Sequence, residues 1–170
     1  MRIFTIGHST RTVDELIKLL QAYGVNILID VRSFPRSIKN PQFNKEVIGA
    51  KLGEHKIRYV WMEKLGGRRK GLGKKSKNTC WKNQSFRNYA DYMETPAFGE
   101  GINEVMLLGR KEMTAIMCAE AVYWRCHRTM ISDYLKSEGV EVLHILDENH
   151  AKEHEYTQCA KLVDGQLSYH

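Results

Sequence analysis

The sequence lacks any long hydrophobic run. The apolar part of the N-terminal stretch "MRIFTIGHST" is too short for a signal peptide, and no segment approaches the length of a membrane span. We therefore expect a cytoplasmic protein with no membrane contact. Of the 170 residues, 42% are hydrophobic and 27% are charged, which is ordinary for a globular chain. This length is sufficient for one domain with its own core.

The sequence also lacks paired cysteines at zinc-finger spacing. Its four cysteines are Cys80, Cys118, Cys126 and Cys159. No two of them form a C-x2-C pair, which is the spacing typical of zinc sites. In a chain expected to be cytoplasmic, we interpret all four as free thiols or ligands rather than as disulfides.

Acidic residues are absent from one long segment. Residues 64–82, "KLGGRRKGLGKKSKNTCWK", carry eight Lys or Arg and no Asp or Glu, in a chain whose net charge is +6. Glycines and like charges together predict a mobile basic loop at residues 66–82. Two interpretations remain open, which are a solvated loop and an electrostatic lid that attracts phosphate or nucleic acid.

Helices and strands alternate along the chain as far as residue 147. The patterns predict strands at 2–8, 26–33, 57–65, 113–120 and 140–147, and helices at 12–24, 44–56, 85–94, 98–111 and 125–139. Thr12 and Glu15 are placed to form a capping box at the start of the first helix.

This alternation predicts the fold class. Most of the strands are almost wholly apolar, which is typical of parallel strands covered on both faces. We expect an α/β fold: a single-domain, three-layer structure with a mostly parallel five-stranded sheet and helices on both faces. Residues 1–147 form this domain, and residues 148–170 form a polar C-terminal tail of short helix and coil.

Reactive and polar side chains collect where the predicted strands end. In open parallel sheets, ligands bind at that carboxyl edge, so we expect these residues to line one cleft there. The candidate catalytic residues are His8, Asp30, Cys118, Glu120, Cys126 and His127. The candidate anion- or substrate-binding residues are Ser9, Arg32, Ser33, Gly66, Gly67, Arg125 and Arg128.

A series of spaced motifs runs through the chain. It comprises "TIGHST", "DVRSFPRS" followed by "PQF", "LGG", "FRNYADYM", "MCAE" and "WRCHR" followed by "HI". In these motifs the sequence resembles domain-of-unknown-function family 488, over residues 2 to about 147. The resemblance implies a small α/β protein of prokaryotic, cytoplasmic type. It supplies no reaction, so the chemistry has to come from the residues themselves.

The stretch "MCAEAVYWRCHR" is compatible with three kinds of site. A thiol enzyme resembling tyrosine phosphatases is a near miss, because six residues, several of them bulky, separate Cys118 from Arg125. A zinc site of Cys118, Glu120, Cys126 and His127 has suitable ligand types, but adjacent helical residues diverge by about 100°. Zinc is therefore not favoured, and the identity of any cofactor stays open.

The third kind of site is an acid–base centre for a phosphorylated or nucleotide-like substrate. Asp30 or Glu120 would act as base and His8 or His127 as proton shuttle, while arginines hold the anion. Asp30 is equally compatible with a structural ion pair to Arg32 at the strand end.

Cys126 is expected in the first turn of the helix at 125–139. The helix dipole and the neighbouring Arg125 and Arg128 favour a thiolate there, which predicts a depressed pKa for Cys126. Burial against apolar neighbours would act in the opposite direction.

Together these features predict an enzyme. We expect an acid–base or thiol-assisted hydrolase or transferase that acts on a phosphorylated, nucleotide-like or nucleic-acid substrate in the cleft. The alternative is a non-catalytic nucleic-acid-binding or adaptor protein that uses the basic loop. The expected partner is an anionic small molecule or a nucleic acid, and the oligomeric state is left open.

Overall fold

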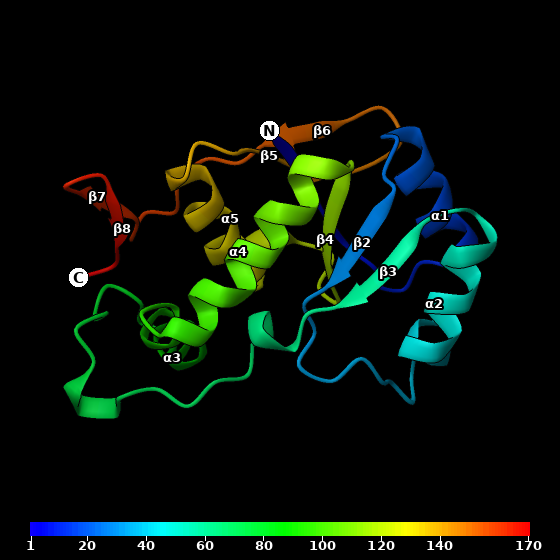
Figure 1. Cartoon of the computed structure of the whole chain (residues 1–170). Coiled ribbons are helices and arrows are strands. Elements are labelled where there is room, and N and C mark those ends of the chain that lie inside the picture. The colour runs from blue at the N-terminus through cyan, green and yellow to red at the C-terminus, as the bar shows by residue number, and fades with distance from the viewer.

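A six-stranded sheet forms the middle layer of the molecule (Figure 1). In the computed structural model, which describes residues 1–170, the strand order is β3-β2-β4-β1-β5-β6. The parallel strands are β1 (Arg2–Gly7), β2 (Ile27–Asp30), β3 (Arg58–Trp61), β4 (Thr114–Cys118) and β5 (Glu141–Ile145). A short antiparallel strand, β6 (Ala151–Glu153), pairs with β5. The predicted α/β class is confirmed, with one strand more than expected.

The central strands are buried because both faces of the sheet are covered. Every residue of β2 ("ILID") and of β4 ("TAIMC") is buried, as continuous apolar runs in a parallel sheet require. The strand β2 is shorter than predicted: its ladder ends at Asp30, where the chain turns so that Arg32 donates back to the Asp30 carboxylate.

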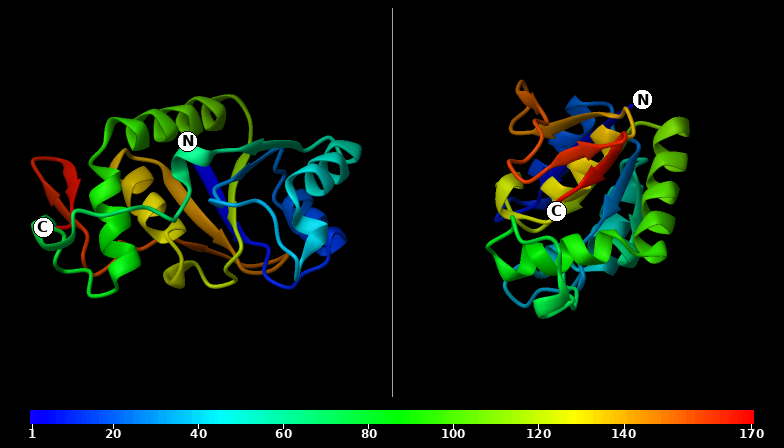
Figure 2. Two further views of the ribbon diagram at one scale, coloured as in Figure 1. Left: turned by 90° about the horizontal axis from the view of Figure 1, so that it is seen from below. Right: turned by 90° about the vertical axis from the view of Figure 1, so that its left-hand side faces the viewer.

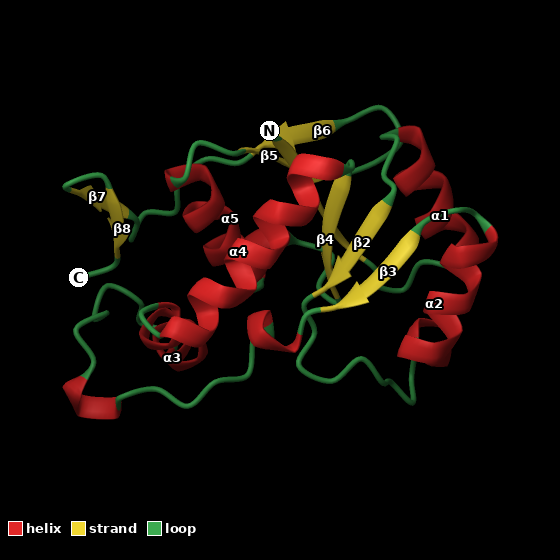
Figure 3. Ribbon diagram, in the orientation of Figure 1, coloured by secondary structure: helices red, strands yellow, loops and turns green.

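Helices cover the two faces of the sheet (Figure 3). On one face lie α1 (Val13–Ala22) and α2 (Lys45–Glu54), over a core cluster of 15 buried residues. On the other face lie α3 (Gln84–Met93), α4 (Pro96–Lys111) and α5 (Arg128–Ser137), over a cluster of 21 buried residues. None of the helices combines the length and the apolar character needed to cross a membrane.

The helix starts follow local capping chemistry. The capping box at Thr12 and Glu15 is present as predicted. The helix α3 begins one residue earlier than expected, because the side chain of Asn83, and not that of Ser85, accepts from the first free backbone N–H groups. Pro96 does not interrupt a helix but occupies the first turn of α4, where its missing N–H costs no hydrogen bond.

Residues 148–170 contain strands, and the predicted short helix in this tail is wrong. After β6, the strands β7 (Lys161–Val163) and β8 (Gln166–Ser168) form a hairpin. Its turn is Asp164-Gly165, with φ of 50° and 80°, the conformation that an Asp-Gly pair favours in two-residue hairpins. The division of the chain at residue 147 stays a prediction.

Two of the cysteines are joined in a disulfide. Cys80, at the end of the basic loop, is bonded to Cys159 in the C-terminal segment, 79 residues later. The expectation of four free thiols is therefore wrong for this pair, because the return of the tail beside the loop brings distant residues together. Cys118 and Cys126 are the two free cysteines, and both are buried.

The basic loop at residues 66–82 is anchored rather than mobile. On α3, the Asp91 carboxylate accepts hydrogen bonds from Leu72 N and Asn78 Nδ2, both at 2.8 Å, and from the Ser76 hydroxyl. Ser76 and Asn78 are buried. The prediction of a freely moving loop is thus not what the structure shows, since backbone and side chains together fix its path. Its lysines still point to solvent.

A buried polar network fastens the C-terminal segment to α5. The Asp133 carboxylate accepts from Thr157 N at 3.0 Å, from the Thr157 hydroxyl at 2.6 Å and from Tyr169 OH at 2.8 Å. It also lies 2.9 Å from His154 Nε2, and His154 Nδ1 lies 2.9 Å from His144 Nε2 on β5. One carboxylate therefore holds three residues of the tail.

We expect Asp133→Asn to reduce the free energy of unfolding by about 3 kcal/mol, because an amide cannot accept from all of these buried donors. Urea denaturation measures the change. Asp164→Asn, an exposed position in the hairpin turn with positive φ, is the matched control and should leave stability unaltered. Equal midpoints for wild type and Asp133→Asn would contradict the assigned role of the network.

Candidate active site

The carboxyl ends of β2 and β4 open into a cleft of about 540 Å³, and β1 ends beside them. Their register places Gly7 beside Cys118 and Asp30 beside Met117, so the three strands end at one level. This edge faces the viewer when the molecule is turned by 90° (Figure 2, left). The loops after β2 and β4, the start of the basic loop and the start of α3 form the walls.

Most of the predicted site residues lie together in this cleft. Those that line it are Arg32, Ser33, Gly67, Cys118, Glu120, Arg125, Cys126 and His127. The predicted residues that do not line it are His8, Ser9, Asp30, Gly66 and Arg128. The roles assigned to all of them remain predictions. Their positions show that the first group can contact a ligand in the cleft, whereas the second group lies behind the cleft wall.

Asp30 is fully occupied by structural partners. Its buried carboxylate accepts from Arg32 Nη2 at 2.6 Å, from Arg32 Nε at 2.9 Å and from Tyr59 OH at 2.6 Å. The second partner of Arg32 Nη2 is the carbonyl oxygen of Phe43. This geometry fits a structural ion pair better than a general base, because no free lone pair faces the cleft.

His8 supports that ion pair from behind. Its ring stacks on Phe43 with centroids 4.2 Å apart, and Nδ1 donates to Ser9 O at 2.9 Å. This leaves Nε2 as an acceptor 3.3 Å from Arg32 Nη1. Burial lowers the pKa of His8 to about 4, so the ring is neutral at pH 7 and positions Arg32.

The two free thiols meet on the floor of the cleft. Cys118 Sγ and Cys126 Sγ are 2.7 Å apart, and the residues are 2% and 6% exposed. Burial acts to raise the pKa of Cys118, but the hydrogen bond from Cys126 and the charge of Arg128 outweigh it and lower that pKa. The same hydrogen bond, together with burial, raises the pKa of Cys126 well above its ordinary value. Of the two thiols, Cys118 is therefore the one whose environment favours the thiolate, with Cys126 as the hydrogen-bond donor.

The expected depressed pKa of Cys126 is thus wrong in direction. Cys126 precedes α5, which begins at Arg128 with His127 as its N-cap, so Cys126 lies outside the first helical turn. The contact between the two sulfur atoms shifts their pKa values in opposite directions and favours the thiolate at Cys118, at the end of β4.

Arg128 supplies a buried positive charge beneath the thiols. The residue is 2% exposed, and its Nη2 donates to the Glu120 carbonyl oxygen at 3.2 Å. Its Nε and Nη1 have no partner, and no carboxylate forms an ion pair with it. A buried guanidinium needs a compensating charge. A thiolate at Cys118 would meet this need, because the Arg128 charge lowers the pKa of Cys118, and Arg128 itself does not line the cleft.

His127 lies beside Cys126 with a defined orientation. Its Nε2 is 3.0 Å from Val31 O and donates to it, so Nδ1 faces Cys126 Sγ at 3.5 Å as an acceptor. Burial lowers the pKa of His127 to about 4, which keeps the ring neutral at pH 7. Gly67 makes room for it, because a Cβ at that position would lie 2.4 Å from His127 Nδ1.

Sequence reasoning missed seven cleft residues. They are Phe34, Arg36, Arg68, Asn83, Ser85, Phe86 and Ala119. Phe34 and Arg36 belong to the "DVRSFPRS" segment, and Arg68 opens the basic loop, so charge and motif position could have pointed to these three. Nothing in the sequence places the start of α3 at the cleft.

The cleft is strongly cationic. Its lining includes Arg32, Arg36, Arg68 and Arg125 but one acidic residue, Glu120. Arg68 N donates to Ser33 Oγ at 2.8 Å, and the Arg68 guanidinium lies over the exposed ring of Phe34, 5.5 Å from its centre. An anionic ligand with a flat apolar part would match this combination of charge and aromatic surface.

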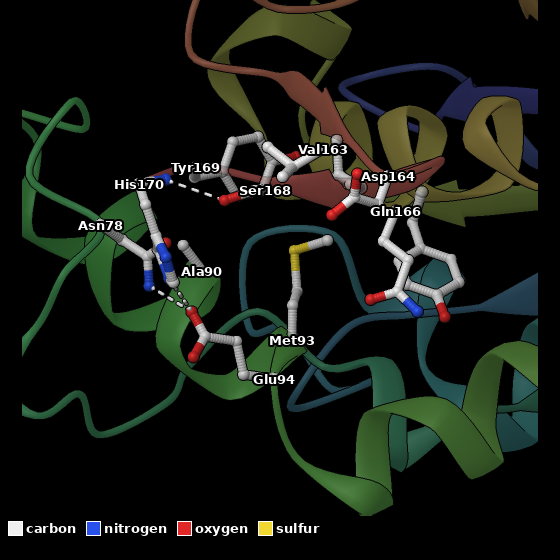
Figure 4. A pocket seen from close by; sticks show the side chains of 12 residues that line it. Asn78, Ala90, Met93, Glu94, Val163, Asp164, Gln166, Ser168, Tyr169 and His170 are labelled. Atoms are coloured by element: carbon white, nitrogen blue, oxygen red, sulfur yellow. Dashed lines mark hydrogen bonds and ion pairs between the residues drawn. The ribbon is translucent and has the colours of Figure 1, made fainter.

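A second cavity lies away from the thiols (Figure 4). It measures about 350 Å³ and lies between α3, the basic loop and the β7–β8 hairpin, with no predicted site residue in its lining. Within it, Glu94 Oε1 accepts from Asn78 Nδ2 at 2.9 Å and lies 3.0 Å from His170 Nε2 (Figure 4). These bonds tie the C-terminus to α3.

No three His, Cys, Asp or Glu side chains are grouped so that they could hold a metal ion. Among the residues considered for zinc, Cys118 and Cys126 are buried whereas Glu120 is exposed.

We expect Gly67→Ala to destabilise the protein by about 1–3 kcal/mol, because the added methyl group forces the buried His127 ring to move. Thermal and urea unfolding measure the loss. In the control Gly53→Ala, the new Cβ meets nothing within 4 Å in α2, and stability should stay equal or rise by up to about 1 kcal/mol. Similar effects of the two substitutions would contradict the close approach at His127.

Comparison with known proteins gives one result. A family model described as domain of unknown function DUF488 matches residues 12–135, a span that includes β2, β3, β4 and every residue that lines the cleft. No curated protein and no solved structure matches the chain. Because the model covers most of the sequence, the resemblance seen in the motifs is confirmed: the chain belongs to the DUF488 family.

Proposed function

We propose that the protein is an enzyme that acts on a phosphorylated, nucleotide-like or nucleic-acid substrate, with the Cys118 thiolate as nucleophile. One observation carries the proposal: Cys118 lies above the buried Arg128 charge, on the floor of a cleft whose rim is cationic. A cleft of about 540 Å³ is within the usual range of about 300–1,000 Å³ for small-molecule sites.

The rim arginines would bind the anionic part of the substrate. Arg68 and Arg125 are exposed and make no ion pair with a carboxylate, so their donors are free for a phosphate. Arg36 has only a loose pair with Glu46 at 3.8 Å. Guanidinium groups bind phosphate through two parallel hydrogen bonds. The ring of Phe34, 67% exposed, would stack on a base or another flat group.

The thiols and His127 supply the reactive groups. Cys118 Sγ would attack the electrophilic atom of the substrate, forming a bond to sulfur while the leaving group departs with the electron pair. Cys126 Sγ lies 2.7 Å from Cys118 Sγ, and its S–H group would donate a hydrogen bond to the Cys118 thiolate on the floor of the cleft. Neutral His127 would then accept a proton from the water that releases the covalent intermediate.

Location in the cytoplasm stays part of the proposal. The reduced pair Cys118 and Cys126 supports it. The Cys80–Cys159 bond argues in the other direction, because disulfides are rare in reducing compartments.

The test of the proposal is the alkylation rate as a function of pH. A Cys80→Ser/Cys159→Ser protein carries either Cys126→Ser, which retains Cys118, or Cys118→Ser, which retains Cys126. We expect the retained Cys118 to titrate below the free-thiol value of about 8.5, because the Arg128 charge remains and a serine hydroxyl replaces the thiol donor at position 126. The retained Cys126 should titrate above that value, because it stays buried. Inorganic phosphate or a nucleoside monophosphate at about ten times its Kd should slow alkylation of Cys118 roughly tenfold.

Identical pH profiles for the two proteins, or alkylation of Cys118 at an unchanged rate with both ligands, would contradict the proposed nucleophile and substrate. Circular dichroism of each variant controls for folding.

A second candidate function, nucleic-acid binding without catalysis, is favoured by the surface next to the cleft. A shallow cavity of about 590 Å³ is lined by Gly67, Arg68, Arg69, Lys70, Ser85 and Asn88, none of them acidic. It shares Gly67, Arg68 and Ser85 with the cleft. The cationic surface is therefore continuous, and a polyanion longer than one nucleotide could follow it.

For this candidate we expect salt-dependent binding of single-stranded oligonucleotides. Arg68→Gln/Lys70→Gln should reduce the slope of log K against log salt by about 1.4, since each lost phosphate contact removes about 0.7. The charge-matched control is Lys18→Gln/Lys111→Gln, at two exposed lysines on α1 and α4, and it should leave the slope unchanged. Equal slopes for the two double variants would exclude this surface as the nucleic-acid contact.

A further inference from the structure

The two free thiols are nearly at bonding distance. Cys118 Sγ and Cys126 Sγ are 2.7 Å apart, whereas a disulfide bond measures about 2.0 Å. An approach of about 0.7 Å between the two sulfur atoms would therefore join them. The closeness is built into the fold, because the loop after β4 returns through a 3₁₀ turn (Tyr123–Arg125) that delivers Cys126 to the strand end.

The two sulfur atoms have different surroundings. Cys118 lies over Arg128 and carries the negative charge, whereas Cys126 has His127 Nδ1 at 3.5 Å as a proton acceptor. Thiol–disulfide exchange needs such an asymmetry: one thiolate attacks, and a second thiol with access to a base resolves the mixed disulfide. Both residues line the cleft, so a reagent that enters it can reach the pair.

We propose that Cys118 and Cys126 form a two-electron redox site that reacts with an anionic disulfide in the cleft and closes to a reversible Cys118–Cys126 bond. The proposal goes beyond the function proposed above and rests on it in one respect, that Cys118 is the attacking thiolate.

The exchange takes place in two steps. Cys118 Sγ attacks one sulfur atom of the incoming disulfide, a mixed disulfide forms, and the first thiolate leaves with the electron pair of the broken S–S bond. The first leaving thiolate takes the proton of Cys126, and Cys126 Sγ then attacks Cys118 Sγ and expels the second thiolate. Two electrons pass from the protein pair to the two sulfur atoms of the reagent.

The charge of the cleft selects the reagent. Three exposed rim arginines, Arg36, Arg68 and Arg125, face a single carboxylate, Glu120, so an acidic disulfide such as oxidised glutathione is attracted and a cationic one such as cystamine is repelled. Closure of the bond would also neutralise Cys118 and leave Arg128 without its counter-charge. The oxidised protein would thus lose the proposed nucleophile until a thiol reduces it.

The experiment compares these two disulfides on the full-length wild-type chain. We expect oxidised glutathione to reduce the free-thiol count from two to none, with no glutathione retained in the intact mass, and to react at least about tenfold faster than cystamine at low salt. Peptide mapping should show a Cys118–Cys126 link beside the original Cys80–Cys159 link. Arg68→Gln/Arg125→Gln should bring the two rates together.

In Cys126→Ser, oxidised glutathione should stop at a single mixed disulfide on Cys118, because the resolving thiol is missing. Unreacted thiols in the wild type, or a mixed disulfide that persists there, would overturn the redox site. Equal rates with both reagents would overturn the assigned charge of the substrate.

These experiments distinguish a failure of the redox proposal from a failure of the proposed function. If phosphate protects Cys118 from alkylation and the pair never closes, only the redox proposal fails. If the pair closes and neither phosphate nor a nucleotide protects Cys118, only the phosphate-bearing substrate is wrong.

Discussion

The common level at which β1, β4 and β2 end is the constraint on which the site depends. Backbone hydrogen bonds continue one step past the strands, from His8 N to Cys118 O and from Val31 N to Met117 O, each at 2.9 Å. Parallel pairing fixes this level for all three strands at once. A shift of one strand along its neighbour would therefore move the side chains at its carboxyl end relative to those of the other two strands. The close contact at Gly7, where a Cβ would lie 1.8 Å from the Glu120 carbonyl oxygen, shows how tightly the loop after β4 is drawn onto this edge.

The buried charge of Arg128 then determines the chemistry of that edge. A guanidinium with no carboxylate beside it makes an anion at Cys118 favourable in a region where burial alone would suppress it. Cys126 and His127 complete the arrangement, one as donor and the other as neutral acceptor. In contrast, the Asp30–Arg32 pair compensates its own charges internally and serves as a support for the loop that carries Ser33 and Phe34.

Local sequence patterns were sufficient to predict most of the fold. Apolar runs located the five parallel strands, the capping box marked α1, and the rule for parallel sheets gathered Cys118, Glu120 and His127 at one edge. Two features depended on contacts that no local pattern contains: the Cys80–Cys159 bond, and the opposite pKa shifts of the two free thiols, which follow from the contact between Cys118 and Cys126. The Asp-Gly turn of the β7–β8 hairpin was a readable signal, but the polar composition of the tail concealed it.

The disulfide gives the chain the topology of a ring with two arms. The closed part runs from Cys80 to Cys159 and contains α3, α4, β4, α5, β5 and β6, and therefore both free thiols. A ring of this size lowers the entropy of the unfolded state by an amount equivalent to about 4 kcal/mol in the chain-entropy description, and that gain falls on the part of the chain that carries Cys118 and Cys126. The N-terminal arm brings β1 into the middle of the sheet, between β4 and β5, so it cannot detach unless the sheet inside the ring opens. Cleavage of the basic loop before Cys80 would thus yield two pieces with no covalent link, held together by strand pairing and by the two core clusters that they share.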